Sequence, residues 1–171
     1  YVVGASPTDA WNFILPGPED RWAGGRPHAA SIYFGLKGQK ASCRFVCDFF
    51  ETHYDAPPLL TLWLKGVKVG TWQAQAGISD AAIDGQPEKG RHSQWVAEIP
   101  ARNLAIGVNE LQIRSERGSW AAFDALRLEG PDTLQTSTVP PHLRVRAAGQ
   151  PQSVLRTPEG PRQPINLEVA N

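Results

Sequence analysis

Short runs in which apolar and polar residues alternate recur along most of the chain, with Gly, Pro, Asn and Asp between them. This alternation is typical of half-buried β-strands, because successive side chains of a strand point to opposite faces. Almost no window shows the spacing of an amphipathic helix. Strands are predicted at Trp11–Leu15, Ala29–Leu36, Ala41–Phe50, Leu59–Leu64, Val67–Trp72, Trp95–Ile99, Asn109–Ser115 and Trp120–Glu129.

Short strands without helices predict an all-β fold, an antiparallel β-sandwich of the jelly-roll kind. Two glycine-containing connections, Lys65-Gly66 and Gly118-Ser119, favour tight hairpins between the strands that flank them. The segment from Gly77 to His92 is polar and rich in Asp, Gly and Pro, which predicts one long loop. Long loops in compact domains are more often functional or mobile than neutral.

The composition changes near residue 131. The last forty residues hold six of the fifteen prolines and none of the six tryptophans. We therefore predict a sandwich over residues 1–131 and a proline-rich tail over residues 132–171. Leu143–Arg146 and Ile165–Val169 still alternate, so the tail is either a linker to a following domain or a strap packed across the sandwich.

The charge is balanced, with 17 Lys and Arg against 17 Asp and Glu, and the charges are scattered rather than clustered. This pattern indicates neither nucleic acid nor a membrane as a partner. No stretch approaches the roughly 20 apolar residues needed to cross a bilayer. The sequence contains no methionine, so we expect it to be a processed or excised piece of a longer product.

The only cysteines, Cys43 and Cys47, lie within one predicted strand. Residues four apart on a strand are separated by about 13 Å, beyond the roughly 7 Å Cα limit for a disulfide. Both are therefore predicted to be core thiols. A zinc site is the less favoured alternative, since no second cysteine pair completes it.

Several segments of residues 1–131 follow one another in an order that matches a known family. They are Trp11–Pro18, Asp20–Trp22, Ser31–Leu36, Leu62–Gly70, Ile99–Leu104 with Gly107–Leu111, and Phe123–Glu129. Together they resemble the C-terminal carbohydrate-binding-like domain of rhamnogalacturonan lyases. One departure is the hairpin, where Lys65-Gly66 replaces the family's usual Asn-Gly.

The resemblance implies a galactose-binding-domain-like jelly roll that takes part in breaking down pectin or another plant cell-wall polysaccharide. It also implies export, to the extracellular space or the periplasm. In that family the catalytic machinery lies in a large N-terminal sandwich, to which nothing in this chain corresponds. The implied role is a non-catalytic carbohydrate-binding module, with the catalytic domain of a polysaccharide lyase or glycoside hydrolase in the same polypeptide as its partner.

Aromatic rings that stack on sugars are the first candidates for a binding site, and the chain has six tryptophans. Trp11, Trp72 and Trp120 abut apolar strand positions and are predicted to be core residues. Trp22 lies in a glycine-rich loop with two arginines that suit a uronate carboxylate. Trp63 faces opposite to its leucine neighbours on one strand. The candidate ligand contacts from these segments are Arg21, Trp22, Arg26 and Trp63.

The loop from Asp84 to Trp95 combines charge, glycine freedom and a terminal aromatic residue, which favours it as the rim of a site. Arg91, His92 and Trp95 are its candidate ligand contacts. The alternative is a solvated loop without a ligand.

One structural calcium ion is a further expectation, since many sandwiches of this kind hold one near the ends of the first and last strands. Asp124 is the candidate ligand, with Glu19, Asp20 or Glu129 beside it. The favoured alternative is that Asp124 is hydrogen-bonded and fixes the last strand.

Independent catalysis is the least favoured of three functional hypotheses, after a binding module and a structural accessory domain packed on a catalytic partner. His53 with Asp48, Glu51 and Asp55, and His92 with Glu88 and Arg91, form polar clusters suited to acid–base chemistry. No nucleophile or metalloprotease motif accompanies them. A single histidine in a loop is usually only solvated.

Overall fold

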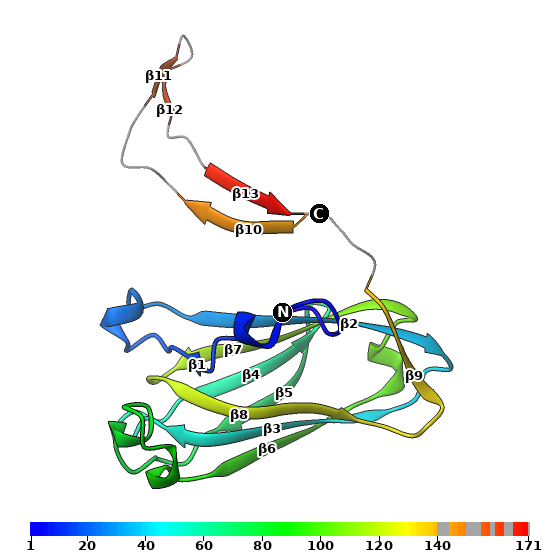
Figure 1. Ribbon diagram of the computed structural model, residues 1–171, viewed down its shortest axis with the longest axis horizontal. Coiled ribbons are helices and arrows are strands. Elements are labelled where there is room, and N and C mark those ends of the chain that lie inside the picture. Colours follow the sequence, from blue (N-terminus) through cyan, green and yellow to red (C-terminus); the bar gives the residue numbers. More distant parts are fainter. Residues whose placement is uncertain (140–143, 150–154, 158–159, 163–165, 171) are drawn as a thin grey trace. The chain divides into compact units, whose positions relative to one another are not determined.

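The alternating runs of the sequence form two facing antiparallel sheets in the computed structural model (Figure 1). One sheet has the order β1-β8-β3-β6 and the other β5-β4-β7-β2-β9. The predicted all-β antiparallel sandwich is confirmed, and each of the predicted runs overlaps a strand. The strands are β1 (Ile14–Leu15), β2 (His28–Gly38), β3 (Cys43–Thr52), β4 (Leu59–Leu64), β5 (Val67–Gln73), β6 (Ser93–Ile99), β7 (Gly107–Arg117), β8 (Ala121–Glu129) and β9 (Leu134–Ser137).

The chain divides into two units, Tyr1–Val139 and Pro140–Asn171. The structure describes residues 1–139 and, beyond them, the strands β10 (Arg144–Gly149), β11 (Leu155–Thr157), β12 (Gly160–Arg162) and β13 (Asn166–Ala170). β10 pairs with β13 and β11 with β12, both antiparallel. Leu143 and Ile165, which begin the alternating runs of the tail, lie outside the described residues. Among the described residues, no helix is long and apolar enough to span a membrane.

The chain passes repeatedly from one sheet to the other, as in a jelly roll. The predicted hairpin at Lys65-Gly66 is confirmed, since it joins the paired strands β4 and β5 with φ angles of 49° and 80°. The second predicted hairpin is wrong. Gly118 has a φ of 78°, as a hairpin glycine often has, but it lies between β7 and β8, which belong to different sheets. It is therefore part of a connection that crosses from one sheet to the other.

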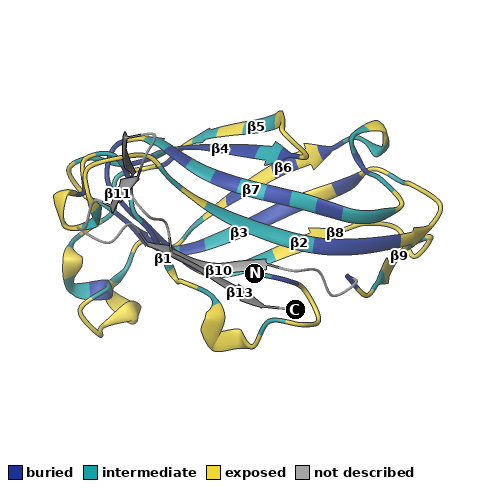
Figure 2. Cartoon of the chain, turned by 90° about the horizontal axis from the view of Figure 1, so that it is seen from above, coloured by how far each residue is buried: buried dark blue, intermediate teal, exposed yellow. Residues whose placement is uncertain are grey.

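The core lies between the sheets, where buried residues run along β3, β4 and β7 (Figure 2). A row of stacked rings fills its centre. Phe49 stacks on Trp72 with ring centroids 4.7 Å apart, and Trp72 stacks on Trp95 at 6.0 Å. The predicted core positions of the tryptophans are confirmed, because Trp120 is buried and Trp11 and Trp72 pack against the core cluster.

Both cysteines are free and buried, which confirms them as core thiols. They point inward from β3 with Phe45 between them. Burial raises the pKa of Cys47 well above its usual value, and burial with the nearby Glu98 carboxylate raises the pKa of Cys43.

Because only the thiolate reacts readily and neither thiol is accessible, we expect both cysteines to resist an aromatic disulfide reagent at about pH 8 in the native protein. Both are expected to react fully after unfolding in guanidinium chloride. The absorbance of the released thiolate measures the reaction. Rapid labelling of either cysteine in the native protein would contradict their burial.

Candidate functional site

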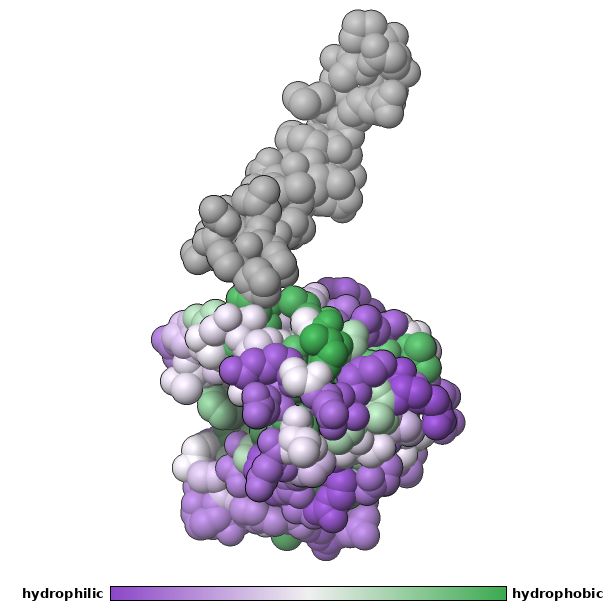
Figure 3. Space-filling view, turned by 90° about the vertical axis from the view of Figure 1, so that its right-hand side faces the viewer, coloured by the Kyte–Doolittle hydropathy of each residue, from purple (hydrophilic) through white to green (hydrophobic). Residues whose placement is uncertain are grey.

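An open groove of about 570 Å³ lies at the end of the four-stranded sheet where the long loop returns to β6. In Figure 1 this is the left end, where the green loop segment lies. The opposite end of the sandwich is mostly hydrophilic, with hydrophobic residues in small separate groups (Figure 3). Residues of three strand regions and the long loop line the groove: Phe13, Phe50, Pro87, Glu88, His92, Phe123 and Asp124.

An irregularity in the pairing of β3 with β8 forms the floor of the groove. Asp48 pairs with Ala125 but Phe49 pairs with Phe123, so Asp124 is left out of the register. On the other strand Phe50 is left out, because the next pair joins Glu51 to Ala122. Such bulges re-aim side chains. The two omitted residues, Phe50 and Asp124, both line the groove.

Phe13 forms one wall of the groove and has 55% of its surface exposed. Its carbonyl accepts a hydrogen bond from the Phe123 backbone N–H at 2.7 Å, which fixes Phe13 beside β8. The 3-10 turn η4 (Pro87–Lys89) also lines the groove, through Pro87 and Glu88. Gly90, which follows η4, lies so close to β3 that a Cβ atom there would be 2.1 Å from the Phe50 carbonyl oxygen.

The polar groups of the groove are two carboxylates, Glu88 and Asp124, and the imidazole of His92. None of the seven lining residues is Lys or Arg. Carboxylates accept hydrogen bonds from hydroxyl groups, and aromatic rings pack against the C–H face of a sugar ring. The arrangement therefore has the two kinds of contact that a saccharide requires.

The long loop is attached to the end of β3 by a buried carboxylate. Glu51 is fully buried, and its Oε1 and Oε2 accept hydrogen bonds from the backbone N–H groups of Thr52 at 3.0 Å and Ile78 at 3.1 Å. The Thr52 hydroxyl donates to the Gln75 carbonyl at 2.6 Å. Arg91, at the other end of the loop, donates to the Ala76 carbonyl at 2.7 Å. These bonds hold both ends of the loop that carries Glu88 and His92.

The predicted rim residues of this loop take three different positions. His92 lines the groove, as does Glu88. Arg91 is engaged with the Ala76 carbonyl. Trp95 has only 3% of its surface exposed and lies edge-on to Phe45 in the core, so its ring is not available to a ligand at the surface.

The predicted site around Trp22 lies outside the groove lining. Trp22 is in the 3-10 turn η2 (Arg21–Ala23) and is 68% exposed, and Arg21 and Arg26 are exposed as well. Its indole Nε1–H donates to Asp20 at 3.1 Å. This loop presents an aromatic ring and two cations on the surface, apart from the carboxylates of the groove.

Asp20 is almost fully buried and is occupied by hydrogen bonds to the protein. Its Oδ2 accepts from the Gly17 backbone N–H at 2.7 Å, and its Oδ1 accepts from Trp22 and from the Ser119 hydroxyl. Asp124 lines the groove instead. In the part of the chain that the structure describes, no three His, Cys, Asp or Glu side chains form a metal-binding group. Calcium at Asp124 or Asp20 stays a prediction.

Trp63 lies in the other sheet, on β4. The Arg114 guanidinium covers its ring at 4.2 Å from the centroid, a cation–π contact. Its Nε1–H donates to the Thr61 hydroxyl at 2.8 Å, and Thr61 donates to Glu116 at 2.7 Å. The structure therefore does not bring Trp63 together with the residues of the groove.

The residues around His53 do not form an acid–base cluster. His53 Nδ1 accepts hydrogen bonds from the backbone N–H groups of Asp55 at 3.2 Å and Ala56 at 2.9 Å, and the ring stacks on Tyr54. The Glu51 carboxylate is committed to backbone amides. His53 therefore serves to shape its own turn.

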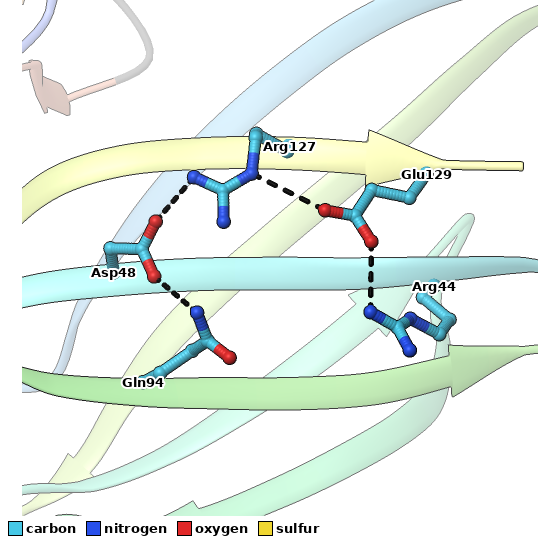
Figure 4. A network of polar contacts seen from close by, with 5 residues as sticks. All are labelled: Arg44, Asp48, Gln94, Arg127 and Glu129. Carbon is cyan, nitrogen blue, oxygen red and sulfur yellow. Dashed lines mark hydrogen bonds and ion pairs between the residues drawn. The ribbon is translucent and has the colours of Figure 1, made fainter.

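A polar network covers the outer face of the sheet beside the groove (Figure 4). The Asp48 carboxylate accepts hydrogen bonds from Gln94 at 2.7 Å and from Arg127. The Glu129 carboxylate forms salt bridges with Arg127 at 3.4 Å and with Arg44 at 2.9 Å. The hydrogen bond from Gln94, with that from Arg127, lowers the pKa of Asp48. Both arginines are thus engaged with carboxylates of the sheet.

Phe13 and Phe50 are the groove residues that the sequence reasoning missed. A signal for the second was present, because adjacent residues on a strand point to opposite faces and Phe49 and Phe50 cannot both enter the core. For Phe13 no comparable signal existed, since it belongs to an alternating run whose other members, Trp11 and Leu15, pack inward.

Comparisons with known proteins add two distant structural likenesses. No family model matches the sequence, and no curated protein matches it. A family 35 carbohydrate binding module from an environmental isolate is 12% identical, with a TM-score of 0.49, over 66% of this chain and 72% of that one. Dimeric latent PorU from Porphyromonas gingivalis is 13% identical, with a TM-score of 0.43, over 58% of this chain and 10% of PorU. The fold assignment rests on the strand pairing of this chain.

Replacing Gly77 by alanine is expected to destabilise the protein by about 2 kcal/mol or more, because a buried clash must be relieved. A Cβ atom at this position would lie 1.8 Å from the Thr52 carbonyl oxygen and 2.2 Å from Glu51 Oε1. Denaturant unfolding gives the change in free energy. Gly70→Ala is the control, because a Cβ atom at Gly70 would have the Ala97 side chain as its nearest neighbour, at 3.2 Å. Equal stability of the two variants would refute the close approach at Gly77.

The lowered pKa of Asp48 predicts a pH-dependent contribution to stability. Because the folded-state pKa is depressed, the contribution is present above the ordinary value of about 3.9 and is lost as the pH falls through the folded-state pKa. Asp48→Asn should therefore reduce the free energy of unfolding by about 0.5–1 kcal/mol at neutral pH. The difference from wild type should shrink towards about pH 2. Asp132→Asn, at an exposed carboxylate, is the control; a pH-independent difference for Asp48→Asn would contradict the prediction.

Proposed function

We propose that this chain is a non-catalytic carbohydrate-binding module of a secreted enzyme that degrades plant polysaccharide of the pectin or rhamnogalacturonan type. The observation that carries the proposal is the groove, in which the exposed ring of Phe13 and the half-buried ring of Phe50 lie beside the carboxylates of Glu88 and Asp124. Aromatic faces supply area for sugar C–H groups, and the carboxylates orient the hydroxyls.

The dimensions and attachment of the groove support this role. Its volume of about 570 Å³ falls within the roughly 300–1,000 Å³ of small-molecule sites. Its rim is held by the buried Glu51 and by Arg91, so Glu88 and His92 are positioned before a ligand arrives. A preorganised site loses less conformational entropy on binding.

The wider context of the proposal comes from the resemblance of the ordered segments between Trp11 and Glu129 to the C-terminal domain of rhamnogalacturonan lyases. On that basis the partner in the same polypeptide is a catalytic domain, and the protein acts outside the cell or in the periplasm.

The test is isothermal titration of the purified chain with rhamnogalacturonan, homogalacturonan and arabinogalactan oligosaccharides, with new reducing ends measured in the same mixtures. Binding without cleavage is expected. Phe13→Ala should raise the Kd of the bound oligosaccharide about tenfold, because the loss of one stacking ring costs about 1.4 kcal/mol. Tyr54→Ala, at an exposed aromatic residue outside the groove lining, should leave the Kd unchanged.

Other outcomes assign the function differently. A large effect of Trp22→Ala with none of Phe13→Ala would move the site to the arginine-containing loop. Release of reducing ends that His92→Ala abolishes would make the chain an enzyme. No binding of any oligosaccharide by the folded chain would favour the structural accessory domain.

A further inference from the structure

We infer that the groove selects uncharged sugar residues and discriminates against uronates. This inference rests on the proposed function and specifies its ligand class. The observation behind it is the charge of the lining, which combines two carboxylates with one imidazole and contains no Lys or Arg.

The carboxylates of Glu88 and Asp124 both line the groove and come from two different elements. Glu88 belongs to the turn η4, and Asp124 is the residue omitted from the pairing on β8. A ligand that lies on the aromatic rings of this groove therefore shares it with two carboxylates. A uronate carboxylate there meets like charge, which opposes binding.

Two arginines that lie near the groove residues along the chain are already engaged. Arg91 precedes His92 but donates to the Ala76 carbonyl at 2.7 Å, which holds the loop. Arg127 follows Asp124 on β8 and is bound to Asp48 and Glu129. Lys89 is exposed beside Glu88 but does not line the groove. Recruiting either arginine for a uronate would break a bond that orders the loop or the sheet face.

Uncharged sugars suit the same groups. Their hydroxyls donate hydrogen bonds to carboxylates, and such charge-assisted bonds are stronger than those between neutral groups. Phe13 and Phe50 offer apolar faces for the ring C–H groups. The arrangement therefore fits a neutral hexose or pentose with free hydroxyls at its edge, as in the uncharged portions of a plant polysaccharide.

The test compares a galacturonic acid oligosaccharide with its carboxyl-reduced counterpart, which has the same length and linkage and differs only in replacing each carboxylate by a CH2OH group. Titrations in EDTA remove any cation that would bridge carboxylates. We expect the neutral oligosaccharide to bind at least about tenfold more tightly than the uronide, because of the repulsion from two carboxylates.

The double variant Glu88→Gln, Asp124→Asn tests the cause. It removes both charges with little change in shape, so the difference between the two ligands should fall to about threefold or less, with weaker binding of the neutral oligosaccharide. Asp132→Asn is the charge control and should keep the wild-type ratio. Thermal unfolding of each variant checks that it is folded.

Three results would overturn the inference. Equal or tighter binding of the uronide in EDTA contradicts it and leaves the proposed binding function standing. A neutral preference that the double variant does not change contradicts the assignment to Glu88 and Asp124. If the folded wild-type chain binds neither oligosaccharide, the proposed pectin-directed function fails and the inference fails with it.

Discussion

The local irregularity between β3 and β8 is the constraint on which the groove depends. Up to Asp48, alternation places Cys43, Phe45 and Cys47 in the core, while Arg44 and Asp48 join the polar network on the other face. Asp124 and Phe50 are then left out of the pairing, one on each strand, so the ladder returns to its earlier register. The irregularity therefore leaves the pairing beyond it in register, and it brings an aromatic ring and a carboxylate to the same groove.

Immediately beyond this point, Glu51 connects the core to the long loop. A buried carboxylate is costly unless hydrogen bonds satisfy it, and here the backbone amides of Thr52 and Ile78 do so. The close approach of Gly77 allows this arrangement, since any larger residue would occupy the space of the carboxylate. The positions of Glu88 and His92 thus depend on packing around Glu51 at the C-terminal end of β3, next to the groove residue Phe50.

The sequence was sufficient to predict the strands, the core thiols and the β4–β5 hairpin, because each leaves a local pattern of alternation or turn residues. The crossover at Gly118 could not be distinguished from a hairpin, since the same left-handed glycine serves both and only long-range pairing decides between them. Trp95 could not be placed either, because a strand-initial aromatic residue after a polar loop suits the rim as well as the core. The meeting of Phe13, Phe50 and Asp124 depends on pairing between distant strands, which residue type alone does not encode.

The groove is open, and its aromatic and polar residues come from elements that are distant in the sequence. Glu88 belongs to η4 and Asp124 to β8, so the two carboxylates reach the groove from different elements. An open site contacts a sugar mainly through one face, and its affinity for a single residue is modest. Under the proposed function, a tethered catalytic domain compensates for such affinity, because binding to the polymer raises the local concentration of substrate. Under the same proposal, modest affinity permits the module to release and rebind along the polysaccharide.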